Sequence, residues 1–186
     1  MRSNGMSRRH LVLGLASIPP GLCFTAAARG ADPPGADQEI SHDAVAIHQE
    51  VAFQASRRRV YHALTDATEF DRVVQLSEAV KAGMVPAHAP PSRIGRRAGA
   101  DFLLFGGYVS GLQLELLPDR RIVQVWRAGS WDAGEYSIAS FVLRDEGAGC
   151  RLVFDHRGFP AGEAQHLVEG WHGNYWQPLA KLLAQA

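Results

Sequence analysis

The sequence predicts an α+β domain in which a curved six-stranded antiparallel sheet wraps around one long C-terminal helix, with two short helices after the first strand. Three observations favour this class. Apolar and polar residues alternate in short segments between turn residues, and an apolar stripe with helical spacing runs through the C-terminal segment. Strands and long helices do not alternate along the chain, so parallel crossover units are not indicated.

The first strand and the two short helices are expected between residues 45 and 80. Val45 to Phe53 alternates with an apolar side, as in a half-buried strand. Ser56 is a suitable N-cap for the first helix, and residues 66–69 (Asp-Ala-Thr-Glu) have the spacing of a capping box that would start the second. Residues 81–95, rich in proline, are expected to form a long loop, either a lid or a plain surface excursion.

The five remaining strands are expected to follow one another through short turns, and consecutive strands of the six are expected to pair. Gly106, Gly107 and Gly111 are the expected places for bulges in a curved sheet. The predicted strands are Ala100 to Leu104, Tyr108 to Leu117, Ile122 to Arg127, Tyr136 to Arg144 and Cys150 to Arg157.

The C-terminal segment has the pattern of an amphipathic helix starting near residues 163–166. Its apolar residues recur at intervals of four and three, which places them on one face. They are Leu167, Trp171, Tyr175, Leu179 and Leu182. Pro178 lies inside this helix and is expected to bend it, because proline cannot donate the backbone hydrogen bond.

Residues 1–28 are expected to be an export signal of the twin-arginine type. Ser7, Arg8 and Arg9 precede an apolar run, 11–24, and three alanines then end at Ala28. The run of about 14 residues is shorter than the ~20 that a spanning helix needs. The alternatives are an ordinary secretory signal or an uncleaved anchor. We therefore expect a periplasmic or secreted protein without an integral membrane segment after signal removal.

The rest of the chain is expected to comprise a flexible linker, 29–43, and one domain, 44–186. Hydrophobic residues make up 46% of the sequence and charged residues 20%, enough for a packed core. The formal net charge is zero, which argues against a nucleic-acid partner held by bulk charge. Cys150 alone would remain after signal removal, so an internal disulfide is not expected.

Motifs spread through this domain resemble the C-terminal-type domain of the activators of heat-shock protein 90 ATPase. The resemblance covers about residues 47–184 and implies a helix-grip (START-like, SRPBCC) fold, whose members typically bind hydrophobic small molecules between sheet and helix. The residues that carry it are 102–108 (Phe-Leu-Leu-Phe-Gly-Gly-Tyr), Gly111, 115–118, 121–123, Trp126, Arg127, Trp131, 134–137, 158–160 (Gly-Phe-Pro), Gly170, Trp171, Tyr175 and Trp176.

Two departures limit what the resemblance implies. The eukaryotic activators carry a separate N-terminal chaperone-binding domain, for which this sequence has no room. An exported protein would also be separated from the cytosolic chaperone, so no chaperone partner is expected outside the cytosol. The family therefore implies common ancestry of the fold and does not imply activation of that ATPase.

Aromatic residues expected on the inner side of the sheet and helix are candidates for a ligand site. Wide aromatic rings can hold a flat apolar ligand, or they can simply fill the core. The candidate residues are Phe102, Trp126, Phe141, Phe154, His156, Trp171 and Tyr175. His156 could orient a ligand or act as an acid or base, but a buried histidine is more often a satisfied structural residue.

No catalytic residues, metal site or cofactor are predicted. The sequence has no nucleophile elbow, no phosphate-binding glycine motif and no histidine or cysteine cluster with zinc spacing. Three hypotheses stay open. The protein holds a hydrophobic small molecule without catalysis, it is a chaperone-like or protein-interaction module, or it is an enzyme that acts on an apolar substrate with His156.

Overall fold

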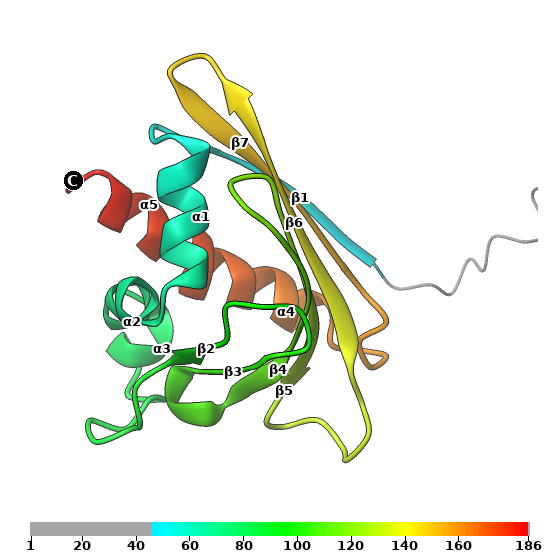
Figure 1. The fold of residues 1–186 in the computed structure, drawn as a ribbon. Coiled ribbons are helices and arrows are strands. Elements are labelled where there is room, and N and C mark those ends of the chain that lie inside the picture. Colours follow the sequence, from blue (N-terminus) through cyan, green and yellow to red (C-terminus); the bar gives the residue numbers. More distant parts are fainter. Residues whose placement is uncertain (1–45, 186) are drawn as a thin grey trace, which may run out of the picture. The chain divides into compact units, whose positions relative to one another are not determined.

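A curved antiparallel sheet of seven strands forms one layer of the fold, in the order β1-β7-β6-β5-β4-β3-β2 (Figure 1). The computed structural model describes residues 46–185, which belong to one compact unit. The predicted boundaries of the signal and the linker, 1–28 and 29–43, lie outside the described residues. The strands are β1 (Ala46–Phe53), β2 (Arg93–Ile94), β3 (Asp101–Leu104), β4 (Val109–Leu117), β5 (Arg121–Ala128), β6 (Ser137–Glu146) and β7 (Gly149–Arg157).

The α+β class and the order of elements along the chain are confirmed, but the sheet has one strand more and the segment after β1 one short helix more than predicted. The expected pairing of consecutive strands is wrong for β1, which pairs with β7 because the last strand returns to the free edge of β6. The additional strand, β2, has two residues and pairs with β3 at the edge of the sheet. It lies in the segment that was expected to be all loop, because a two-residue strand is too short to show an alternating pattern.

The bulge in β4 lies between Gln113 and Glu115 rather than at a glycine. Gly111 serves another purpose. A Cβ at this position would lie 1.9 Å from the carbonyl oxygen of Val125 and 2.6 Å from Cζ of Phe102. Glycine therefore allows the Phe102 ring to pass directly over the strand.

Three short helices follow β1, namely α1 (Arg57–Thr65), α2 (Ala67–Gln75) and α3 (Glu78–Lys81). Ser56 and Asp66 cap the first two as predicted, and the Asp66 carboxylate accepts from the backbone N–H of Thr68 and of Glu69. A full capping box would also have the Glu69 side chain accept from the backbone N–H of the cap residue. The Glu69 carboxylate instead accepts hydrogen bonds from Arg59 and Arg72.

The C-terminal helix crosses the concave side of the sheet (Figure 1). It consists of α4 (Ala164–Trp171), a π-helical turn (His172–Trp176) and α5 (Gln177–Leu183). The irregularity expected at Pro178 thus takes the form of a wide turn just before it. Within this turn the Gln177 N–H bonds the carbonyl of His172, five residues back.

Aromatic contacts pack this helix onto the inner face of the sheet. The Trp171 ring lies 4.3 Å from that of Phe154 and 4.2 Å from that of Tyr175, measured between centroids. Trp176 is also held by a hydrogen bond of 2.6 Å from its indole N–H to Oε1 of Gln49 in β1. The helix is therefore fixed at its middle, which leaves its first turns to form one wall of a cavity.

Candidate functional site

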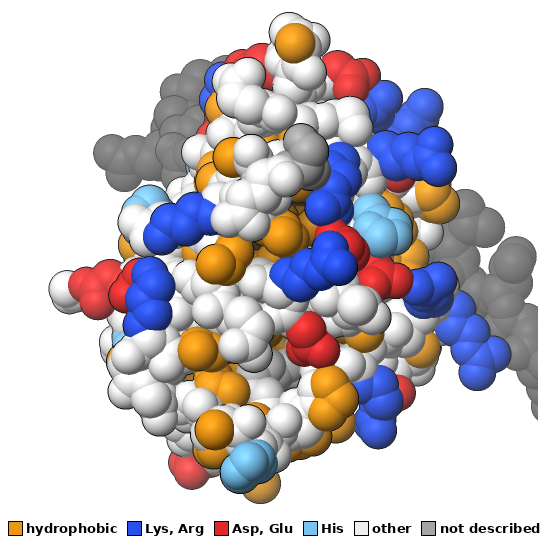
Figure 2. All heavy atoms as spheres, turned by 90° about the vertical axis from the view of Figure 1, so that its left-hand side faces the viewer, with side chains coloured by type: hydrophobic (Ala, Val, Ile, Leu, Met, Phe, Trp, Pro, Cys, Tyr) orange, Lys and Arg blue, Asp and Glu red, His pale blue; other side chains and the backbone are white. Residues whose placement is uncertain are grey.

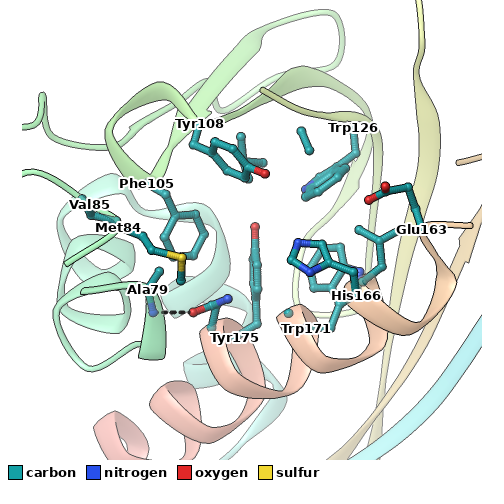
Figure 3. Close-up of a pocket in the computed structure, with 15 residues that line it drawn as sticks. Ala79, Met84, Val85, Phe105, Tyr108, Trp126, Glu163, His166, Trp171 and Tyr175 are labelled. Atoms are coloured by element: carbon teal, nitrogen blue, oxygen red, sulfur yellow. Dashed lines mark hydrogen bonds between the residues drawn. The ribbon is translucent and has the colours of Figure 1, made fainter. Parts of the chain in front are cut away.

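A cavity of about 240 Å³ lies between the first half of the C-terminal helix and the inner face of β4 and β5 (Figure 3). Its third side is formed by α3 and the segment after it. The lining is predominantly apolar and, within the part of the chain that the structure describes, includes no Lys or Arg. The lining residues are Ala79, Met84, Val85, Phe105, Tyr108, Val109, Trp126, Ala128, Glu163, His166, Leu167, Gly170, Trp171, Asn174 and Tyr175.

The helical wall follows from the spacing of residues along α4 and the π turn. The lining residues between positions 163 and 175 recur in the i, i+3, i+4, i+7 pattern, so they share one face. Gly170 lies in the middle of this face, and a Cβ added there would meet no atom within 4 Å. The absence of a side chain at Gly170 therefore keeps part of the cavity open.

Phe105 and Trp126 form much of the opposite wall. Phe105 has a φ of 52°, in the left-handed region that bulky residues rarely adopt. This backbone turns its ring inward, where it lies 5.4 Å from the Tyr175 ring. Trp126 is packed between Trp131 and Trp171, with ring centroids 5.3 and 5.6 Å away. Both aromatic groups are therefore held in place by their neighbours.

The third side of the cavity is tied to the helix by one hydrogen bond. Asn174 Oδ1 accepts from the backbone N–H of Ala79 at 2.8 Å (Figure 3). Beyond this bond, Met84 is 67% exposed and Val85 is half-buried. The hydrogen bond thus holds α3 against the C-terminal helix, whereas the exposed Met84 lies at the margin of the cavity.

Two buried polar groups on the cavity wall have no hydrogen-bond partner among residues 46–185. They are the Trp126 indole N–H and the Tyr175 hydroxyl, on side chains that are 4% and 5% exposed. Burial raises the pKa of Tyr175, and the nearby Trp126 N–H offsets part of that rise without completing a hydrogen bond. Tyr175 therefore remains protonated, and its hydroxyl lies toward Tyr108 and Trp126 (Figure 3).

His156 is placed in the core, behind the cavity wall, and both ring nitrogens are engaged. Nδ1 accepts from the Trp171 indole N–H at 3.0 Å, so the proton of the neutral ring is on Nε2. Nε2 donates to Ser137 Oγ at 2.6 Å, and the Ser137 hydroxyl donates to the Trp126 carbonyl at 3.0 Å. Burial lowers the pKa of His156 to about 4. This arrangement is that of a satisfied structural histidine.

The cavity brings together three of the seven residues expected at a ligand site, Trp126, Trp171 and Tyr175. The other four, Phe102, Phe141, Phe154 and His156, are buried in the core and do not line it. Sequence reasoning missed the rest of the lining. Glu163, His166 and Gly170 lie on the same face of the C-terminal helix as Trp171. This spacing could have indicated the helical wall of the cavity from the sequence.

The described residues carry few other groups of chemical interest. Within residues 46–185, no cluster of His, Cys, Asp and Glu could hold a metal ion. Burial and the nearby Asp145 raise the pKa of the Cys150 thiol to about 11, so this cysteine is a poor nucleophile. No helix within the same range is long and apolar enough to cross a membrane.

Surface charge on the helical side of the unit is mixed in sign. Figure 2 shows basic and acidic side chains interspersed on this face, with no region of a single sign. Nucleic-acid binding surfaces are in general strongly positive. This face therefore lacks the charge pattern of such a surface.

Comparison with known proteins identifies similar sequences. The profile of the family described as "Activator of Hsp90 ATPase homolog 1-like protein" matches residues 54–184. The human activator of 90 kDa heat shock protein ATPase homolog 1 is 32% identical over 114 residues, which are 61% of this chain and 32% of the human protein. A Dictyostelium discoideum homologue is 32% identical over 77 residues, or 41% of this chain and 20% of that protein. The matches thus span about a third or less of these relatives.

Solved structures show the same fold at lower identity. An HSP90 activator from Plasmodium falciparum superposes with a TM-score of 0.64 at 19% identity, covering 75% of this chain and 96% of that one. CalU16 from Micromonospora echinospora gives 0.59 at 21% identity, covering 76% and 77%. At these identities the structural likeness concerns the fold alone.

Proposed function

Because this chain belongs to the family of activator of Hsp90 ATPase homolog 1-like proteins, which share the helix-grip fold, we propose that it binds a hydrophobic small molecule without catalysis, between the sheet and the C-terminal helix. The observation that carries the proposal is the cavity of about 240 Å³ with its apolar lining and few polar groups. Such a lining is typical of small-molecule sites.

Several features favour binding over catalysis. The two unpaired polar groups on the cavity wall, the Trp126 N–H and the Tyr175 hydroxyl, stay protonated at neutral pH. His156, the acid or base considered from the sequence, has both nitrogens engaged in the core. A reaction would need a group poised to exchange a proton with the substrate, and neither the two unpaired donors nor His156 meets that need. The acidic and basic side chains of the lining, Glu163 and His166, are half-buried and exposed.

The experiment that tests the proposal fills the cavity at Gly170. Tetralin, a two-ring hydrocarbon, would be titrated by isothermal calorimetry into the wild type, Gly170→Leu and the matched control Gly170→Ala. The leucine side chain would occupy the space that is open beside Gly170, whereas alanine adds a single methyl group. We expect Gly170→Leu to weaken tetralin binding at least tenfold and Gly170→Ala to retain most of it. Equal binding by all three proteins would place the ligand elsewhere, and no binding by the wild type would contradict the proposal.

A second candidate, a chaperone-like or protein-interaction module, is favoured by an apolar strip on the outer face of the sheet. Leu112, Leu114 and Ile138 are 43%, 47% and 41% exposed, and Leu112 and Ile138 both pair with Val125. The relatives' names point to the 90 kDa heat-shock protein as the partner class. Stimulation of that chaperone's ATP hydrolysis by the purified chain, lost in Leu112→Asp, would favour this candidate.

We further propose that the protein is exported through the twin-arginine route and acts in the periplasm or outside the cell. The proposal rests on Arg8, Arg9, the apolar run after them and the alanines ending at Ala28. We expect the mature protein to begin near residue 29 and an Arg8→Lys, Arg9→Lys variant to accumulate in the cytosol. Export of that variant at the wild-type rate would exclude the twin-arginine route.

A further inference from the structure

The two unpartnered donors on the cavity wall indicate which chemical group the ligand carries. Buried N–H and O–H groups are nearly always paired, since an unpaired one loses its hydrogen bonds to water without compensation. The Trp126 N–H and the Tyr175 hydroxyl are both unpaired among the described residues, and both line the same cavity. A ligand that only filled space would leave them unpaired.

The two donors are close enough to serve one acceptor. The Trp126 N–H points closely enough at the Tyr175 hydroxyl to lower the pKa of Tyr175 as a hydrogen-bond donor, but the contact falls outside full hydrogen-bond geometry. The Tyr175 hydroxyl lies on the side of the cavity that faces Trp126 (Figure 3). A carbonyl oxygen has two lone pairs and can accept from both groups at once.

The charges around the cavity favour a neutral acceptor. Among the described residues no Lys or Arg lines it, and the acidic and basic side chains of the lining are Glu163 and His166. His166 is exposed, and Glu163 is half-buried. A carboxylate bound at the two donors would lose its hydration without gaining a cation, which disfavours it relative to a ketone, ester or amide.

A ligand hydroxyl could also accept from both donors, but it brings a hydrogen that needs an acceptor of its own. A carbonyl oxygen pairs the two donors without adding such a hydrogen, so it fits better. The volume also bounds the size of the ligand. Since a 150 Å³ apolar cavity holds benzene, a cavity of about 240 Å³ suits a molecule of about ten non-hydrogen atoms.

We propose that the cavity selects a neutral, carbonyl-bearing apolar molecule, whose carbonyl oxygen accepts hydrogen bonds from the Trp126 indole N–H and the Tyr175 hydroxyl. This inference rests on the proposed function, because it names the ligand class of the same cavity. It assigns Trp126 and Tyr175 as the residues that determine specificity.

The test compares three probes on one ring skeleton by isothermal calorimetry. They are tetralin, 1-tetralone, which adds a carbonyl, and the 1-carboxylate of tetralin. We expect 1-tetralone to bind the wild type about tenfold more tightly than tetralin, and the carboxylate to bind more weakly than 1-tetralone. Tyr175→Phe should remove most of the preference for 1-tetralone and leave tetralin binding nearly unchanged. Tyr136→Phe, at an exposed tyrosine outside the cavity, is the matched control.

A second measurement reports on Trp126 directly. The sequence has four tryptophans, so a ¹H–¹⁵N spectrum resolves four indole signals. The Trp126 signal should shift more with 1-tetralone than with tetralin. Equal affinities for tetralin and 1-tetralone in wild type and Tyr175→Phe, with no such shift, would overturn the carbonyl inference and leave the proposed function standing. If none of the probes binds the wild type, both fail.

Discussion

At the scale of single residues, His156 and Tyr175 show how burial alone does not define a role. Both are inward aromatic side chains that sequence alternation could place in the interior. His156 meets Trp171 on one side and Ser137 on the other, so its hydrogen bonds are complete. Tyr175 finds no partner for its hydroxyl among the residues that the structure describes. The difference arises from which side chains face each ring, and a periodic pattern does not contain that information.

Because His156 is buried as a neutral ring, we expect the stability of the protein to depend on pH. The pKa of His156 falls from 6.5 to about 4 in the folded protein, because burial disfavours the charged ring. The unfolded chain therefore binds one more proton between these values, and stability is lost as the pH falls from 6.5 toward 4. Between pH 7 and 4.5 we expect this residue to lower the free energy of unfolding by about 2 kcal/mol.

Urea unfolding at both pH values, in the wild type and in His156→Gln, measures this contribution. Glutamine does not titrate, so its variant keeps only the pH dependence of the other groups, among them Asp66, whose pKa is lowered mainly by the Glu69 backbone N–H. The wild type should lose about 2 kcal/mol more than the variant on acidification. Parallel losses in the two proteins would mean that His156 is not buried in its neutral form.

At the scale of elements, two glycines are expected to respond in opposite ways to the same substitution. Gly170 is helical with open space around its missing Cβ, so Gly170→Ala should stabilise the protein by about 1 kcal/mol. Gly111→Ala would bring a Cβ against the Val125 carbonyl and the Phe102 ring, and should cost about 2 kcal/mol or more. Thermal unfolding of the two variants checks the contrast, and a Gly111→Ala protein as stable as the wild type would contradict the close approach.

The N-cap of α2, Asp66, is the subject of a further prediction at this scale. Asp66→Ala should lower the free energy of unfolding by about 1 kcal/mol, because two backbone N–H groups lose their acceptor. Asp66 also bonds Arg96. Asp66→Asn is the matched control, since asparagine still caps a helix but lacks the charge. If denaturant unfolding shows equal losses for both variants, the ion pair with Arg96 rather than the cap is the source of the effect.

At the scale of the whole molecule, the order of strands and helices could be predicted because each element has a strong local pattern. β1 alternates along its whole length, and the stripe from Leu167 to Leu182 lies on one side of the C-terminal helix. The strand β2 could not be predicted because two residues show no alternation, and Pro178 indicates an irregularity in the helix without specifying a π turn. The cavity was only partly foreseen for the same reason. Phe105 and Met84 reach it through a left-handed residue and a loop, which follow no periodic pattern.

The central claim is that the cavity between sheet and helix holds an apolar small molecule. Native mass spectrometry of the protein purified without detergent from the cells that make it tests this claim most directly, with Gly170→Leu purified alongside. We predict an excess mass in the native wild-type spectrum that disappears on denaturation, corresponds to a neutral molecule of about ten non-hydrogen atoms, and is missing from Gly170→Leu. Identical native and denatured masses for the wild type, or the same excess mass on Gly170→Leu, would contradict the account.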